Sequence, residues 1–204
     1  NSEVATAVTL TSANGYAAST TRAVGTNANE VVATNATGTD GFLASNYDIT
    51  YVSGSLAITA RPITLTATDR TKVYGDALNL GTSAFTKTAG TYANSELATA
   101  VTLTSANSYA ASTTRAVGTN NSEVVATNAT GTDGFLASNY DITYVSGSLA
   151  ITARPITLTA TDRTKVYGDT LNLGTSAFTK TAGTYANSES ATAVTLTSAN
   201  SYDA

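Results

Sequence analysis

The chain has 204 residues, a formal net charge of −4 and only 12% charged residues. It contains no Cys, His, Met or Trp, so it lacks disulfides and the usual side chains of thiol catalysis, imidazole catalysis and soft-metal sites. The acidic balance argues against nucleic acid, which requires a basic face, and no apolar stretch approaches the roughly 18 residues of a membrane span. We therefore expect a protein that is not an enzyme, with no catalytic, cofactor-binding or metal-binding residues and no cofactor.

An internal repeat of 93 residues organises the sequence. The segment Glu30–Asp76 returns unchanged as Glu123–Asp169, and comparison of residues 1–111 with 94–204 finds seven differences. This period exceeds the roughly 20–50 residues of helical solenoids and suits one small domain per repeat. We expect residues 1–60 to be the end of one repeat, 61–153 a complete repeat and 154–204 the start of another, as in an excerpt from a longer protein.

Strands are predicted throughout each repeat, and no helix is predicted. Thr, Val, Ile and Tyr are abundant, and these residues suit a pleated, half-buried surface. Apolar residues alternate with polar ones in successive short runs, separated by Gly- and Asp-containing turns at intervals of about 8–12 residues. In chain order the runs lie around Val73–Tyr74, Phe85, Val101–Leu103, Val124–Val125, Phe135–Leu136, Tyr140–Tyr144, Leu149–Ile151 and Ile156–Ala160. This pattern predicts an all-β protein of tandem small domains, sandwich-like (Ig-like or a related elongated form), that together form a rod.

Two local features carry specific expectations. The break at Ser146-Gly147 between two alternating runs predicts a hairpin in which Gly147 supplies a positive φ. The joint between repeats is short, because only Thr59–Pro62 separates the run Leu56–Ile58 from Ile63–Leu65. Proline fixes its own φ and favours extension of the residue before it, so we expect the chain to pass almost straight from one repeat to the next.

The segment NYDITYVSGSLAITARPITLTATDRTKVYGD resembles the MBG domain, the mostly β, glycine-rich repeat of large bacterial surface proteins and filamentous-haemagglutinin-like adhesins. Its hallmarks are a tyrosine-rich strand pair, a proline junction and a Lys-x-Tyr-Gly-Asp strand end. They occur here at Asn46–Ile58, Pro62 and Lys72–Asp76, and again at Asn139–Ile151, Pro155 and Lys165–Asp169. The chain departs from the family after Tyr-Gly-Asp, where Ala or Thr followed by Leu replaces a common Asn-Pro. The resemblance implies a secreted, surface-displayed spacer and transfers no catalytic residue.

Several side chains are candidates for metal binding or covalent cross-linking, each to be compared with a purely structural role. Four aspartates near turns are candidates for calcium between repeats, but their spacing lacks the clustered acidic pattern of calcium loops and favours solvated turn residues. These are Asp133, Asp141, Asp162 and Asp169. Lys72 and Lys87 are candidates for internal isopeptide bonds, against the simpler role of strand lysines that protect an exposed edge.

Two further patterns have simple explanations. Glycosylation sequons at Asn35, Asn120 and Asn128 arise easily by chance in a sequence rich in Asn and Thr. Tyr140 and Tyr144 have the alternate spacing of core or cross-strand residues rather than of ligand-stacking groups.

Two functions are compatible with these features. The first is a structural stalk of a bacterial cell-surface adhesin, which holds a distal adhesive region away from the cell and has neighbouring repeats of the same chain as its partners. The second is a repeat module that binds a ligand or assembles with other copies of the chain through exposed strand edges into an extracellular filament.

Overall fold

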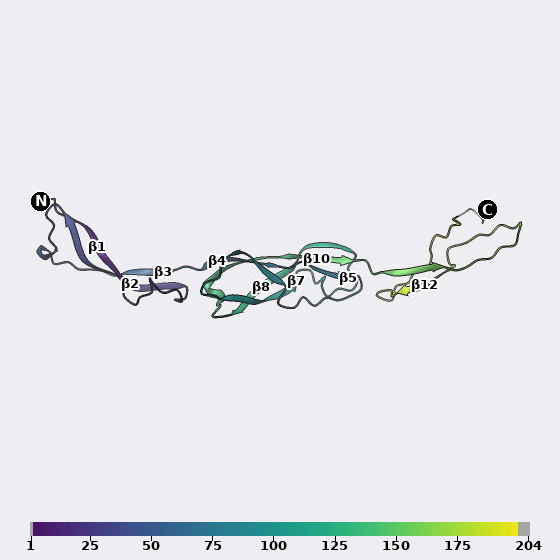
Figure 1. Cartoon of the computed structure of the whole chain (residues 1–204), viewed down its shortest axis with the longest axis horizontal. Coiled ribbons are helices and arrows are strands. Elements are labelled where there is room, and N and C mark those ends of the chain that lie inside the picture. Colours follow the sequence, from purple (N-terminus) through teal and green to yellow (C-terminus); the bar gives the residue numbers. More distant parts are fainter. Residues whose placement is uncertain (1, 200–204) are drawn as a thin grey trace. The chain divides into compact units, whose positions relative to one another are not determined.

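The computed structural model describes residues 2–199, and within them every strand is short or of moderate length and the only helices are two single 3₁₀ turns (Figure 1). The predicted all-β class is confirmed. The 3₁₀ turns are η1 (Ala44–Asn46) and η2 (Ala137–Asn139). The strands are β1 (Val4–Ser12), β2 (Gly25–Thr39), β3 (Gly54–Ile58), β4 (Arg61–Ala67), β5 (Arg70–Val73), β6 (Phe85–Gly90), β7 (Leu97–Ser105), β8 (Gly118–Thr132), β9 (Tyr140–Val145), β10 (Gly147–Thr152), β11 (Ile156–Ala160) and β12 (Phe178–Gly183).

The chain forms two compact units, each assembled from three segments. The first unit comprises residues 1–65, 87–101 and 128–144, and the second comprises residues 66–86, 102–127 and those from 145 onwards. The first unit holds the antiparallel sheet β1-β2-β3 and strand β9. The second holds β5, β10 and the antiparallel pair β11-β12. Strands β4, β6, β7 and β8 have residues in both units, and of β9 only Val145 belongs to the second.

The strands between Arg61 and Thr152 form two sheets, in the orders β5-β10-β8-β7 and β6-β4-β9. Strand β10 pairs in parallel with β5 and antiparallel with β8. The described residues form four sheets, and each sheet takes all of its strands from a single range, 1–60, 61–153 or 154–204. As domain boundaries, these ranges remain predictions.

Alternating apolar side chains of both sheets make the core of this middle region. In β4 the side chains of Ile63, Leu65 and Ala67 are at most 2% exposed, while the intervening threonines are more accessible. Strand β10 follows the same rule at Leu149 and Ile151. Other buried apolar residues here include Leu80, Ala98, Val101, Ala110, Val124, Ala126, Ala129, Phe135 and Tyr140. The period of two that predicted these strands therefore also separates core from surface.

Identical sequence is buried to different degrees in different copies. Ile63 is 2% exposed in β4, whereas Ile156, one period later in β11, is 40% exposed. Strand β4 lies between two partner strands, and β11 pairs with β12 alone. Burial of these side chains thus depends on the strands that surround them, and not on the local sequence.

The predicted hairpin at Ser146-Gly147 is wrong. Strand β9 belongs to the sheet β6-β4-β9 and strand β10 to the sheet β5-β10-β8-β7, so the chain crosses between sheets at Gly147. Gly147 also lacks a positive φ. It is buried, and a Cβ there would lie 2.6 Å from the carbonyl oxygen of Ala67. The glycine therefore permits a close approach of two backbones, a second reason for which proteins use glycine.

The predicted strands on either side of the repeat joint are confirmed. Strand β3 ends at Ile58 and β4 begins at Arg61, so two residues, Thr59 and Ala60, connect them. Pro62 lies within β4. Among residues 2–199 there is no helix that has both the length and the apolar character needed to span a membrane.

Candidate functional site

The aspartates considered as calcium ligands do not converge. Asp133, Asp141, Asp162 and Asp169 are all exposed, and Asp133 accepts a hydrogen bond from the neighbouring Thr132 hydroxyl at 3.0 Å. Within residues 2–199 no group of three or more acidic side chains is placed to hold a metal ion. The structure thus places these four aspartates apart from one another, with Asp141 inside strand β9.

Lys72 is buried, which the interpretation as an edge lysine did not predict. Its side chain is 6% exposed, and its ammonium group donates to the backbone carbonyl oxygens of Tyr109, Ala110 and Ser112. Desolvation lowers the pKa of this amine. Because its protons are directed at carbonyl oxygens, Lys72 serves to hold the loop at 109–112 against β5.

Lys87 and the sequon residue Asn120 have local partners. Lys87 is exposed on β6, an outer strand of its sheet, and it donates to the carbonyl oxygen of Gly90 at 2.6 Å. Its position agrees with the predicted edge lysine. The amide of Asn120 donates to the carbonyl oxygen of Leu149 at 3.3 Å and accepts from Arg115 at 3.0 Å. Asn35 and Asn128 both adopt positive φ angles near 50° within strands β2 and β8.

A buried glutamate was missed by the sequence analysis. Glu123 is 1% exposed, and its carboxylate accepts hydrogen bonds from the hydroxyl of Ser105, from the backbone and side-chain amides of Asn107, and from the backbone amide of Tyr109. The side-chain amide of Asn107 is 2.8 Å from the carboxylate. This carboxylate network closes the turn between β7 and β8.

The carboxylate network recurs one period earlier. Glu30 is fully buried and accepts from Ser12, Asn14 and Tyr16 in the same pattern. Burial alone raises the pKa of a carboxyl group, but these hydrogen bonds outweigh burial and lower the pKa of Glu30 to about 2. Burial again raises the pKa of Glu123, but the hydrogen bonds from Ser105, Asn107 and Tyr109 outweigh burial. The pKa of Glu123 therefore lies below its ordinary value.

The tyrosines predicted as core or cross-strand residues have those roles. Tyr140 is 6% exposed, stacks on Phe135 with ring centroids 5.0 Å apart, and meets Tyr92 edge-on at 6.0 Å. Tyr144 is half-buried, and its hydroxyl accepts from the backbone amide of Ala129 at 2.8 Å. The hydroxyl of Tyr140 donates to Glu96 at 2.6 Å.

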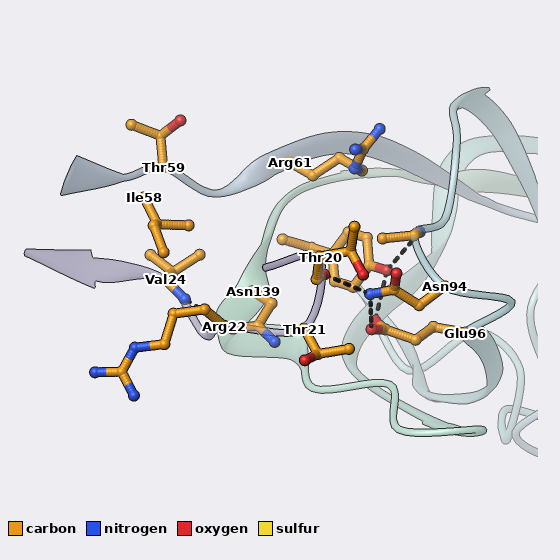
Figure 2. Close-up of a pocket in the computed structure, with 12 residues that line it drawn as sticks. Thr20, Thr21, Arg22, Val24, Ile58, Thr59, Arg61, Asn94, Glu96 and Asn139 are labelled. Carbon is orange, nitrogen blue, oxygen red and sulfur yellow. Dashed lines mark hydrogen bonds between the residues drawn. The ribbon is translucent and has the colours of Figure 1, made fainter. Parts of the chain in front are cut away.

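Residues of consecutive repeats meet in the first unit. The side-chain amide of Asn94 donates to the carbonyl oxygen of Thr20 at 2.7 Å, and the backbone amide of Val24 donates to the side chain of Asn139 at 3.2 Å. Figure 2 shows Asn94 directed at Thr20, beside Glu96. We call this set of contacts the first junction, because it joins residues of the range 1–60 to residues of the range 61–153.

A second junction in the second unit repeats the first. The side-chain amide of Asn187 donates to the carbonyl oxygen of Thr113 at 2.9 Å, exactly one period after Asn94 and Thr20. Both asparagines have left-handed backbone, with φ of 48° and 49°. Asparagine tolerates this conformation better than other residues with a Cβ, which accounts for its use here.

At the second junction the Tyr-Gly-Asp turn of the preceding repeat adds further contacts. The hydroxyl of Tyr74 donates to the carboxylate of Glu189, and this bond raises the pKa of the phenol. Arg154 donates through Nε to the carbonyl oxygen of Tyr74 at 2.8 Å and forms an ion pair with Asp76. One arginine therefore holds two groups of the same turn.

The fit around Gly75 is tight. Gly75 has a φ of +91°, and a Cβ there would lie 2.4 Å from the Cβ of Ala186 and 3.2 Å from the guanidinium of Arg154. The Tyr-Gly-Asp motif thus supplies a hydroxyl, a bare backbone and a carboxylate to one surface. The sequence marks this motif as a strand end and a family hallmark, but its partners could not be predicted from the sequence.

No protein-family model, no curated protein and no solved structure matches this chain.

Proposed function

We propose that the chain is a structural spacer, the tandem-repeat stalk of a bacterial cell-surface adhesin that projects a distal adhesive region. The observation that carries the proposal is the recurrence of one junction contact, Asn94 to Thr20 and Asn187 to Thr113, in two consecutive copies of the repeat. A contact that recurs with the period of the sequence gives each repeat the same interface with its neighbour.

The chemistry of the junctions supports a fixed attachment between neighbours. Three of the six bonds named at the junctions join a side chain to a backbone carbonyl, and hydrogen bonds fix distance and direction more closely than apolar contact does. The two-residue connection Thr59-Ala60 leaves little freedom beside them. We expect many repeats in series to form a stiff rod.

The buried polar groups also support a structural role. The Glu123 carboxylate and the Lys72 ammonium bind groups of their own repeat, so their bonds close turns and loops. The extracellular location and the non-catalytic role rest on the resemblance of Asn139–Ile151 and Lys165–Asp169 to MBG repeats.

Replacing Tyr74 by alanine is expected to loosen the second junction, because it removes the bond to Glu189 and the ring beside Arg154. The chain has no native cysteine, so one dye pair can be attached at Asp141→Cys and Ser190→Cys, both exposed positions. Single-molecule energy transfer should show a broader distance distribution for Tyr74→Ala than for the parent.

The matched control is Tyr167→Ala, the same change one period later, where the ring is fully exposed. It should leave the distribution unchanged. Equal broadening in both variants, or in neither, would show that the Tyr74 contact does not fix neighbouring repeats.

A further inference from the structure

The strands between Arg61 and Thr152 are arranged so that the first ones lie beside the last ones. In the sheet β6-β4-β9 the first strand, β4, neighbours β9, and in the sheet β5-β10-β8-β7 the second strand, β5, neighbours the last, β10. Only two residues connect β4 to β5, and one residue connects β9 to β10. A pull on the chain that enters and leaves this region therefore acts on strands that are paired with each other.

The pairing of β5 with β10 is parallel, which decides how such a pull loads it. Its register joins Arg70–Val73 to Leu149–Thr152 at four positions. The entering chain reaches β5 at its amino end, and β10 continues into the leaving chain at its carboxyl end. Opposite pulls at these two ends slide parallel strands along each other, so the hydrogen bonds between the strands are loaded together and not one after another.

Further bonds extend the pair beyond its ladder at the carboxyl end of β10. The backbone amide of Tyr74 donates to the carbonyl oxygen of Thr152 at 2.9 Å, and the hydroxyl of Thr152 donates to the carbonyl oxygen of Lys72 at 3.2 Å. Arg154 donates to the carbonyl oxygen of Tyr74 at 2.8 Å and forms an ion pair with Asp76. The last residues of the leaving chain are thus bonded to β5 and to the turn after it.

Each strand of the pair is also attached to a neighbour. The buried ammonium group of Lys72, in β5, donates to three carbonyl oxygens of the loop at 109–112. Strand β8 pairs antiparallel with β10, and the side chain of Asn120 in β8 donates to the carbonyl oxygen of Leu149 at 3.3 Å. Sliding of either strand therefore breaks these bonds as well as those of the pair.

We infer that β5 and β10 form a mechanical clamp, which makes a repeat resist unfolding when the chain is pulled along its length. Strands pulled lengthwise share the load over four paired positions, whereas strands pulled apart from one end lose their bonds singly. The resistance is kinetic, because forced unfolding is governed by the unfolding rate. This inference goes beyond the spacer function, which concerns the attachment between neighbouring repeats, because the clamp joins strands of one repeat.

The test is single-molecule pulling of the full chain in two directions. The chain has no native cysteine, so handles can be attached at chosen pairs of exposed positions. Handles at Thr59→Cys and Ala153→Cys load the clamp lengthwise. Handles at Thr68→Cys and Val145→Cys pull on the amino ends of the two strands and separate them. The lengthwise direction should require a few-fold higher force and release about 300 Å of chain in one step. Urea unfolding checks that both variants are as stable as the parent.

A substitution at the carboxyl end of the clamp locates the resistance. Arg154→Met removes the bonds to Tyr74 and Asp76, so it should lower the lengthwise force. It should leave the separation force unchanged, because separation starts at the opposite end of the pair. Lys87→Met, the control, removes an exposed charge outside the clamp and should change neither force.

Two results would overturn the inference. One is a lengthwise force no higher than the separation force, and the other is an effect of Arg154→Met that is the same in both directions. Neither result bears on the distance distributions that test the spacer function, since those report the attachment between repeats and not the force that unfolds one.

Discussion

Replacing Gly147 by alanine is expected to lower the free energy of unfolding by about 1–3 kcal/mol, and replacement by valine by more. The added Cβ would lie 2.6 Å from the carbonyl oxygen of Ala67 and 3.0 Å from the carbonyl carbon and oxygen of Thr68. All three are backbone atoms, and β10 is paired on both sides, with β5 and β8. The strand therefore has little freedom to move away from the clash.

The matched control is Gly54→Ala, at the same repeat position one period earlier. A Cβ at Gly54 would meet only the Cβ of Val31 at 3.7 Å, an ordinary contact. Loss of glycine also restricts the unfolded chain, so this variant should be neutral or more stable by up to about 1 kcal/mol. Urea unfolding followed by circular dichroism measures both. Equal effects at the two glycines would contradict the close approach at Gly147.

Replacing Glu123 by glutamine is expected to cost about 2–4 kcal/mol, because hydrogen bonds to a charged acceptor contribute more than neutral ones and a buried donor without a partner is costly. The carboxylate receives the hydroxyl of Ser105 and amides of Asn107 and Tyr109. Glutamine keeps the shape but presents an NH₂ group to these donors. The loss should appear as a lower urea midpoint.

The same residue predicts a pH dependence. The pKa of Glu123 in the folded state lies below its ordinary value, and the unfolded value is about 4.3. Its contribution to stability is therefore complete above the unfolded pKa and is lost as the pH falls through the folded pKa. The parent should lose stability on acidification below about pH 4.5, and Glu123→Gln should lose less.

Asp141→Asn, which removes an exposed charge from the same repeat, controls for general charge loss and should follow the parent. An unchanged acid profile in Glu123→Gln would show that the carboxylate network does not stabilise the fold. The measurement is the unfolding free energy at a series of pH values from about 7 to about 2.5.

The sequence predicted most of the strands because alternation and burial have the same physical cause, although no strand forms at Phe135–Leu136. Ile63, Leu65 and Ala67 alternate with threonine and point into the core. Alternation interrupted by glycine does not, however, reveal whether a strand turns back or crosses to another sheet. The hairpin at Ser146-Gly147 was mispredicted for this reason, since the close approach of Ala67 depends on a strand 80 residues away in the sequence.

The polar contacts were harder to predict. Lys72 was predicted to protect a strand edge and no role was predicted for Glu123, yet both are buried, because one sequence does not show which distant carbonyls or amides will surround a charge. Asn94 begins an Asn-Ser-Glu triplet that recurs at Asn187, but the sequence does not reveal its junction role, which depends on the position of Thr20. Asn94 and Asn187 make the same bond in successive copies of the repeat. This recurrence distinguishes the contact from an isolated one.

The most direct test of the spacer is small-angle X-ray scattering with in-line light scattering on chains of two, three and four 93-residue repeats, extrapolated to infinite dilution. Fixed junctions predict monomers whose longest dimension grows by the same increment with each added repeat. Growth with about the square root of the number of repeats, as for domains on flexible linkers, would contradict the account.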